Sequence, residues 1–277
     1  MRATRRAFTA VLVVALATAL TFLFLPVLAV FLDVPPGRLW QELRSDVAVD
    51  ALVVTAKTNL IAQALILTIG TPTAYFLATR SFPGRSLALT LIELPLVLPP
   101  AVGGIGLLSA FGSQGLLGEE VTALGLDIAF TQVAVVLAVT FVASPFYIRP
   151  AVAAFEAVDA TLLDASRTLG AGPARTFFRV ALPLAAGGLS AGAALAFARG
   201  LGEFGATIMF AGSLQGVTQT LSLAVYEQFD VAFDIALSIS AFLVVVSGAL
   251  LLAVKLVPGW TSSLSAWASR SAISASS

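Results

Sequence analysis

Six long apolar runs constrain this chain more than any other feature. They are residues 7–32, 58–79, 86–111, 128–148, 181–198 and 235–254. A helix needs about 20 apolar residues to cross the hydrocarbon core of a bilayer. Backbone polar groups find no water in that core, so each run must satisfy its hydrogen bonds internally, as a helix does. The pattern predicts an all-α integral membrane protein with six transmembrane helices, organised as a single transmembrane domain over residues 1–277.

The first run shares its basic start with signal peptides. Residues 7–32 carry no charge and follow Arg2, Arg5 and Arg6. The apolar core of a signal peptide is only about 7–15 residues long, which is shorter than this run. The length therefore favours a retained first helix over residues 7–32. At the other end, residues 260–277 are rich in Ser and Ala and are expected to form a frayed tail.

Composition agrees with a membrane protein and excludes several kinds of chemistry. Hydrophobic residues occupy 58% of the 277 positions and charged residues 11%, whereas a soluble domain has about 25% charged residues. Cys and His are both absent. The sequence therefore offers no disulfide, no thiolate or imidazole metal site, and no Cys or His nucleophile or base. This removes most hydrolase and redox-enzyme hypotheses.

Basic residues sort to one side of the expected membrane. Six spans place both termini on the same side, and the positive-inside rule assigns the more basic side to the cytoplasm. Only Arg38, Arg44 and Lys57 fall on the opposite side. The residues on the basic side are Arg2, Arg5, Arg6, Arg80, Arg85, Arg149, Arg167, Arg175, Arg179, Lys255 and Arg270. We therefore expect a multi-pass protein of the cell membrane, with both termini and the loop over residues 155–182 in the cytoplasm.

That loop is charged but has a helical pattern. Asp159 can cap a helix, because its carboxylate accepts from free backbone N–H groups of the first turn. One face of this helix carries Leu162, Ser166 and Leu169. Gly170 is expected to end the helix in a left-handed conformation, and Pro173 suits the first position of the next one. The loop is thus predicted to form two short amphipathic helices joined by a glycine elbow.

The elbow resembles a signature of permease subunits of binding-protein-dependent ABC importers. The family pattern is Glu-Ala-Ala, three residues, Gly, nine residues, then Ile-x-Leu-Pro; here Asp164-Ala165-Ser166, Gly170 and Val180-Ala181-Leu182-Pro183 match it with both spacings intact. The resemblance implies a type I ABC importer permease fold, in which the loop is a coupling helix seated in a groove of the ATPase. The residues to which it assigns this coupling role are Asp164, Ala165, Ser166, Leu169, Gly170, Ala171 and Pro183.

The third run contains a cluster of prolines, Leu94-Pro95-Leu96-Val97-Leu98-Pro99-Pro100. Prolines this close together interrupt the backbone hydrogen bonding of a helix. Within a membrane, irregular backbone is tolerated only where protein or a water-filled cavity shields it. Pro99 and Pro100 are therefore predicted to mark a break that faces a pathway.

The fifth run carries small residues four apart: Gly188, Gly192, Ala196 and Gly200. Small residues on one helix face let another helix approach closely. The stripe indicates either ordinary helix packing or a wall where two copies of the chain, or neighbouring helices, meet around a pathway.

Next come Arg199 and Glu203, which are one helical turn apart and can pair. A charge at the bilayer centre costs about 2.5–3.5 kcal/mol, so such residues usually face protein or water. Arg199 is the one basic residue expected within the spans. Two roles stay open for Arg199, Glu203 and the adjacent Phe204: a gate that senses anions near the outer mouth, or a buried pair that locks the helix end.

The stretch from Ala198 to Thr207, ARGLGEFGAT, is similar to a run in molybdate permeases, as are residues 94–100 and 167–172. The resemblance covers about residues 52–254. It implies import of an oxyanion, with molybdate favoured over sulfate or tungstate. It also implies a second copy of the chain, two cytoplasmic ABC ATPases and an extracytoplasmic binding protein. No Walker motif occurs, so ATP and Mg are expected to bind the ATPase and no cofactor or metal to bind this chain; nothing in the sequence indicates a nucleic-acid partner.

Two other classes of protein have weaker support. An ion-coupled secondary transporter would have a coupling-ion site at the midplane and often an inverted repeat, but only Glu93, Arg199 and Glu203 are candidates and no repeat is visible. An intramembrane enzyme without His or Cys would need a Ser–Lys or Asp–Asp pair in its spans, and the sequence offers none. Co-purification of an ATPase would distinguish an importer subunit from both.

Overall fold

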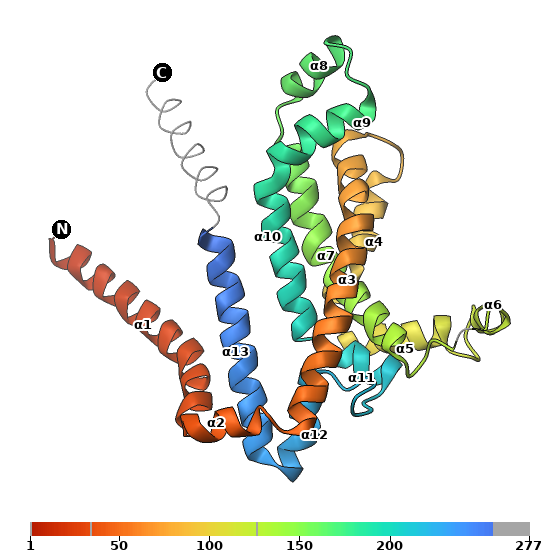
Figure 1. Cartoon of the computed structure of the whole chain (residues 1–277). Coiled ribbons are helices and arrows are strands. Elements are labelled where there is room, and N and C mark those ends of the chain that lie inside the picture. Colours follow the sequence, from red (N-terminus) through yellow and green to blue (C-terminus); the bar gives the residue numbers. More distant parts are fainter. Residues whose placement is uncertain (1, 34, 126, 257–277) are drawn as a thin grey trace.

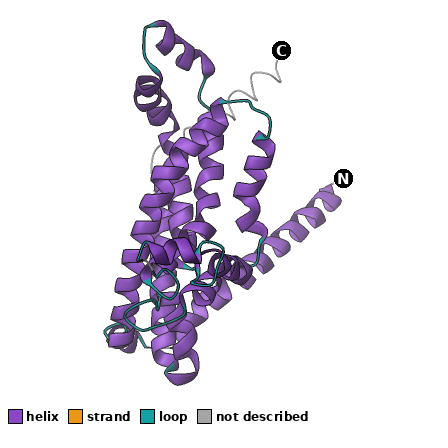
Figure 2. Ribbon diagram, turned by 90° about the vertical axis from the view of Figure 1, so that its right-hand side faces the viewer, coloured by secondary structure: helices purple, strands orange, loops and turns teal. Residues whose placement is uncertain are grey.

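The computed structural model describes residues 2–33, 35–125 and 127–256. Over these ranges the chain forms helices and short connections, without a strand (Figures 1 and 2). The helices are α1 (Arg2–Leu32), α2 (Pro36–Glu42), α3 (Asp46–Thr79), α4 (Arg85–Val97), α5 (Pro100–Phe111), α6 (Gly118–Ala123), α7 (Gln132–Glu156), α8 (Ala160–Thr168), α9 (Pro173–Thr176), the π-helix η1 (Phe177–Ala181), α10 (Leu182–Leu201), α11 (Gly205–Ala211), α12 (Leu221–Val231) and α13 (Phe233–Leu256). The predicted all-α class is confirmed. The expected tail over residues 260–277 lies outside the described residues.

Helix length and hydropathy support five to six membrane crossings. Five helices in the described part are long and apolar enough: Phe8–Leu32, Asp46–Thr79, Gln132–Glu156, Pro173–Leu201 and Phe233–Ala253. A sixth crossing exists if α4 and α5 count as one span, and these two helices are bent by 115° at their junction. The third apolar run is therefore two helices. The bend follows from the prolines, because Pro99 and Pro100 have no backbone N–H and Pro100 instead begins α5.

Residues 33–57, which lie between the first two predicted spans, are largely helical, so the predicted start of the second span at residue 58 was wrong. Helix α3 begins at Asp46, because the Ser45 hydroxyl accepts from the Ala48 N–H at 3.4 Å. Ala48 and Ala51 on the first turns of α3 are buried against α12 and α13. Their packing extends the helix beyond the apolar run that begins at residue 58.

The fourth predicted span is also misplaced. Helix α7 begins after Thr131, whose hydroxyl accepts from the Val133 N–H at 3.2 Å, and it continues to Glu156. Arg149 therefore lies inside a candidate span, and Lys57 lies inside α3. The expectation that Arg199 is the one basic residue within the spans is wrong, because α3 and α7 extend into the charged segments that flank their apolar runs.

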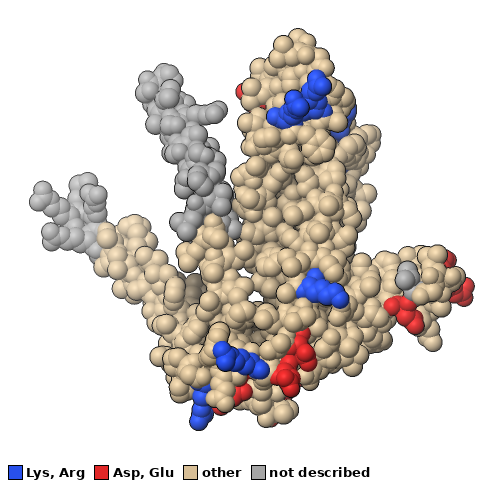
Figure 3. All heavy atoms as spheres, viewed as in Figure 1, with Lys and Arg blue, Asp and Glu red and all other residues tan. Residues whose placement is uncertain are grey.

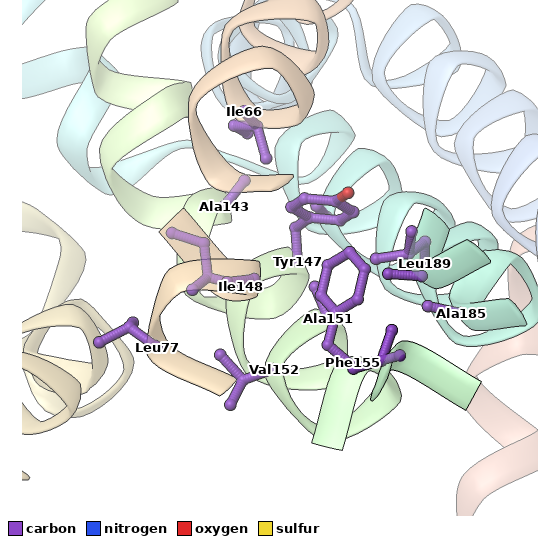
Figure 4. Packing of buried hydrophobic residues seen from close by; sticks show 14 residues of the cluster. Ile66, Leu77, Ala143, Tyr147, Ile148, Ala151, Val152, Phe155, Ala185 and Leu189 are labelled. Atoms are coloured by element: carbon purple, nitrogen blue, oxygen red, sulfur yellow. The ribbon is translucent and has the colours of Figure 1, made fainter. Parts of the chain in front are cut away.

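Helices α3, α7 and α10 form the central bundle (Figure 1). The main core cluster lies between them (Figure 4) and includes Ile66, Leu77, Ala143, Tyr147, Ile148, Ala151, Val152, Phe155, Ala185 and Leu189. A Cβ built on Gly70 would lie only 2.9 Å from Tyr147 Cδ1. Close contact of α3 with the Tyr147 ring therefore requires glycine at position 70.

The two ends of the bundle differ in structure and charge. Helices α8 and α9 project from one end, toward which α1 begins and α13 ends (Figure 1). Helices α2 and α12 lie at the opposite end, and α5, α6 and α11 lie to one side of it. Figure 3 shows Lys and Arg over the α8–α9 end and also near the opposite end, while Asp and Glu gather mainly near α6 and that opposite end. The α8–α9 end is therefore the more basic of the two, as the sequence pattern predicts.

Candidate functional site

The candidate site lies where two helix breaks meet. One break separates α4 from α5 at Leu98 and Pro99; the other separates α10 from α11 at residues 202–204. A Cβ built on Gly205 would lie 2.9 Å from Pro100 Cβ, and one built on Gly104 would lie 2.5 Å from the Ala206 carbonyl oxygen. The start of α5 therefore packs backbone to backbone against α11. The structure thus brings the predicted proline break next to the predicted Arg199–Glu203–Phe204 segment.

Arg199 and Glu203 form the pair that their spacing predicted. Arg199 Nη2 lies 2.7 Å from Glu203 Oε2, and the Glu203 side chain is 1% exposed against 25% for Arg199. Helix α10 ends at Leu201, however, so the two residues do not share one continuous helix as expected. The other Glu203 oxygen, Oε1, accepts from the Ala206 N–H at 2.7 Å. Glu203 therefore has two functions in the fold: it neutralises Arg199 and caps the first turn of α11.

Phe204 follows this pair in an irregular backbone conformation with φ −132° and ψ −55°. Its ring contacts Tyr226 of α12, with ring centroids 5.2 Å apart. The aromatic contact connects the break after α10 to α12, at the end of the bundle opposite α8.

The small-residue stripe of α10 faces α7 and α3 of the same chain. A Cβ on Gly188 would lie 2.5 Å from Ala154 Cβ, and one on Gly200 would lie 2.6 Å from Asn59 Oδ1. Gly192 approaches the Tyr147 carbonyl oxygen, and Ala196 is fully buried. These contacts are helix packing within one chain.

The predicted coupling loop has the expected elbow. The Asp159 carboxylate accepts from the Thr161 N–H at 2.9 Å, and Gly170 has a left-handed φ of +81°. The Ser166 and Thr176 hydroxyls are hydrogen-bonded at 2.9 Å, which ties α8 to α9 across the elbow. Leu163 is buried at 8% exposure, whereas Leu162 and Leu169 are 47% and 88% exposed. The face named from the sequence therefore presents two leucines to the outside.

The second half of the loop differs from the expected separate helix. Gly172 precedes Pro173 at the first turn of α9, as predicted. Helix α9 then continues through η1 into α10, so residues 173–201 form one helical segment. Continuity arises because the core holds this part of the chain: the Phe177 ring packs against Tyr75 and Phe155. The elbow is therefore followed directly by a continuous helical segment that ends beside the Arg199–Glu203 pair.

A second charged pair was not predicted. Glu93 Oε1 of α4 lies 2.7 Å from Arg149 Nε of α7, and their side chains are 35% and 51% exposed. From the sequence, Glu93 was expected within a span, whereas Arg149 was expected outside the spans on the cytoplasmic side. The signal that could have located it is the apolar pattern on both sides of Arg149, which continues the helix past residue 148.

Comparison with known proteins decides the family. The model of a family described as binding-protein-dependent transport system inner membrane component matches residues 66–257. The chain belongs to this family. It is therefore a membrane component of a transport system, and the resemblance read from the elbow is confirmed.

Relatives of this permease include proteins of molybdenum and sulfate transport systems. The molybdenum transport system permease protein ModB of Mycobacterium tuberculosis is 44% identical over 236 residues, which is 85% of this chain and 89% of that protein. ModB of Escherichia coli is 41% identical over 177 residues, covering 64% of this chain and 77% of the relative. The sulfate transport system permease protein CysT of Synechococcus elongatus is 35% identical over 87% of this chain and 88% of its own length.

Solved structures show the same fold. A bacterial ABC transporter that imports the polysaccharide alginate matches with a TM-score of 0.68 at 16% identity, over 90% of this chain and 93% of that one. The MetNI methionine ABC transporter, in an inward-facing conformation, matches with a TM-score of 0.54 at 18% identity, over 80% and 96%. The permease thus has the fold of ABC importer membrane subunits.

Beyond the break after α10, this permease has buried polar atoms without partners. Among the described residues, side-chain oxygens of Thr207, Ser213, Gln219 and Thr220 are buried and make no hydrogen bond within the chain. Such groups normally bind water or a ligand, because an unsatisfied buried polar group is costly. The sequence carried a signal for two of these four positions, Gln219 and Thr220, which belong to the polar triplet Thr218-Gln219-Thr220 between apolar segments.

Proposed function

We propose that this permease is the membrane-spanning subunit of an ATP-driven importer that carries molybdate into the cell. The observation that carries the proposal is the 44% identity to a molybdenum transport system permease over 85% of the chain. The partners would be a second copy of the chain, two cytoplasmic ABC ATPases that bind ATP and Mg, and an extracytoplasmic binding protein. The chain itself would carry no catalytic residue and no cofactor.

The orientation follows from charge. The more basic end, which carries α8 and α9, would lie in the cytoplasm together with both termini, as the positive-inside rule requires. The elbow around Gly170 would then be accessible to an ATPase. In the coupling segment, residues 160–176, the exposed positions include Leu162, Asp164, Ala165, Leu169 and Gly170. These residues would seat in the ATPase groove together with Ser166 and Ala171. Pro183 on α10 would transmit the movement of this segment.

The two helix breaks would line the pathway near its outer end. Pro99, Pro100 and Phe204 supply irregular backbone there, and Arg199 supplies a guanidinium group that is one-quarter exposed. A positive group of this kind stabilises a doubly charged oxyanion in a site of low dielectric constant. The pair is neutral as a whole and Glu203 also caps α11, so the pair would act as a structural lock, while the exposed part of the Arg199 guanidinium would be the element of a gate that an oxyanion meets.

A cysteine at position 101 tests whether the α4–α5 break faces the pathway. Ala101 is half-buried beside Gly205, and irregular backbone at this depth must face protein or water. In this naturally Cys-free chain, Ala101→Cys is expected to react with a charged thiol reagent in at least one nucleotide state. Ala134→Cys, at a fully buried position of α7, is the control and should stay unreactive. Inertness of Ala101→Cys in every nucleotide state would instead indicate a sealed kink.

Arg149 is expected to assist transport from the cytoplasmic half. A half-exposed charge on a spanning helix must face water or protein, because its exposure to lipid is costly. A charge-assisted hydrogen bond from Arg149 to the oxyanion would contribute about 1.5–3 kcal/mol. Because Arg149→Gln loses this bond, the variant should lower the uptake rate by roughly tenfold or more. Arg149→Lys, which keeps the charge, should retain most of the uptake. Equal loss of uptake and thermal stability in both variants would mean that the pair with Glu93 is only structural.

Substrate identity is tested by reconstitution. The permease, its ATPase and its binding protein in liposomes should accumulate molybdate, and sulfate in excess should compete poorly. Similarity to the sulfate permease of Synechococcus elongatus makes sulfate the second candidate. Sulfate uptake that exceeds molybdate uptake would select this alternative, and tungstate is the third substrate to compare. Failure of the chain to co-purify with an ATPase would contradict the importer proposal itself.

A further inference from the structure

A cavity of about 470 Å³ lies beside the coupling segment, outside the pathway described above. It is formed by the last two turns of α3, the end of α8 and the start of α9. Its lining residues are Pro72, Tyr75, Phe76, Thr79, Arg80, Arg167, Pro173 and Thr176. The cavity therefore joins the end of one spanning helix to both sides of the Gly170 elbow.

The polar groups of this cavity suit an anion. Two of the lining side chains are guanidinium groups and none is a carboxylate. The two threonine hydroxyls of the lining are bonded within the chain, Thr79 to the Tyr75 carbonyl and Thr176 to Ser166, so the guanidinium groups are the donors for an anion. Within the described part of the chain, Arg80 has no acidic partner, while Arg167 is held by Asp164 at 2.9 Å. Guanidinium groups bind the oxygens of phosphate-like groups in pairs of hydrogen bonds. The chemistry matches a tetrahedral oxyanion group with several acceptor oxygens.

The remaining walls are apolar and open toward the side of α3. Pro72 and Phe76 are exposed, and the exposed fraction of Phe76 is 53%. Farther along the same helix, Ile69 is 63% exposed. An anion bound between Arg80 and Arg167 could thus carry an apolar chain lying along α3. Basic pockets at the cytoplasmic ends of spanning helices are known to fit lipid headgroups of this kind.

We propose that this cavity binds a tetrahedral oxyanion group, either the phosphate of an anionic lipid headgroup or a free oxyanion. Because it contacts α3, α8 and α9, the bound group ties the coupling segment to the end of α3. An oxyanion group bound in this cavity would then stabilise one position of the Gly170 elbow. The proposed orientation of the chain decides only which leaflet would supply the lipid. The proposal does not depend on which oxyanion the importer carries.

The experiment uses the intact importer with Thr79→Cys as its reporter. Thr79 lines the cavity, and its hydroxyl donates only to the Tyr75 carbonyl of its own helix, so cysteine is a mild change. Labelling of Cys at this position by a water-soluble maleimide is measured in nanodiscs of phosphatidylcholine alone, with added phosphatidylglycerol, or with inorganic phosphate or molybdate in the buffer. A bound oxyanion group should slow the labelling in a concentration-dependent manner.

Variants assign the protection to the two arginines. Arg80→Gln and Arg167→Gln should each weaken the protecting ligand by roughly tenfold, since each removes a charge-assisted hydrogen bond. Arg179→Gln, an exposed arginine at the same end that does not line the cavity, is the matched control and should keep full protection.

Each outcome decides the proposal. Protection by phosphatidylglycerol alone identifies the lipid headgroup, and protection by phosphate or molybdate in neutral nanodiscs identifies a free oxyanion. Absence of protection in both arms, protection that survives both arginine variants, or a cysteine that never reacts would overturn the site. The assay measures labelling and not transport, so loss of protection is distinguishable from a failure of the proposed molybdate function.

Discussion

Replacing Glu203 with alanine is expected to destabilise this permease by about 3–5 kcal/mol, because breaking a buried ion pair leaves an uncompensated charge. The side chain is 1% exposed and pairs with Arg199 at 2.7 Å. The same carboxylate accepts from the Ala206 N–H at 2.7 Å, so α11 also loses its cap. Because α11 packs directly on α5 through Gly104, uptake should fall together with stability.

Thermal unfolding of the detergent-solubilised protein measures this effect. Glu120→Ala, at an exposed acid of α6, is the control and should change the melting temperature little. Glu203→Gln keeps an oxygen that can accept from Ala206 and should lose less stability than alanine. An unchanged melting temperature for Glu203→Ala would show that the pair does not hold the break together.

The hydrogen bond from the Ala206 N–H to Glu203 also limits what can be learned by exchanging the two charges of the Arg199–Glu203 pair. In the variant Arg199→Glu with Glu203→Arg, the new arginine cannot accept from the Ala206 N–H. The exchange should therefore impair folding even if the original pair has no role in transport. The gate role is tested better by Arg199→Lys alone, which keeps the cap and a positive charge beside Glu203 but removes the forked guanidinium, and which should reduce uptake more than it reduces thermal stability.

Gly170→Asp is expected to abolish transport while membrane insertion and folding are retained. The backbone at Gly170 has φ +81°, and a Cβ at this position would meet nothing within 4 Å. A left-handed backbone costs a residue with a side chain roughly 1–2 kcal/mol, and Asp tolerates it better than most residues. The large effect is expected from the proposed ATPase groove, where a charged side chain would occupy the space that the glycine leaves free.

Pull-down of the ATPase measures this loss directly. Gly125→Asp is a matched control, since Gly125 also has a positive φ, of +73°, and open space around its Cβ, but lies near α6 at the other end. The control should retain ATPase binding and transport. Wild-type recovery of the ATPase by Gly170→Asp would argue that the elbow does not sit in the groove.

Several features could be predicted from the sequence because their causes are local. Each apolar run of about 20 residues is long enough to identify a spanning helix by itself. Pro100 at the start of α5, Gly170 at the end of α8 and Asp159 at its cap each depend on contacts within a few positions. The Arg199–Glu203 pair is also close in sequence, so its existence was predictable. Its geometry was not, because the end of α10 at Leu201 depends on how α11 packs against α5.

The arrangement of distant residues was decided by the tertiary structure. Glu93 and Arg149 are paired because α4 lies against α7, and no signal local to either residue specifies that partner. The cavity between Arg80 and Arg167 exists only because the elbow folds back over the end of α3. Helix formation and helix ends are governed by backbone hydrogen bonds and nearby side chains. Contacts between segments far apart in the chain are governed by packing, which places Gly104 against Ala206 and so brings the two helix breaks together.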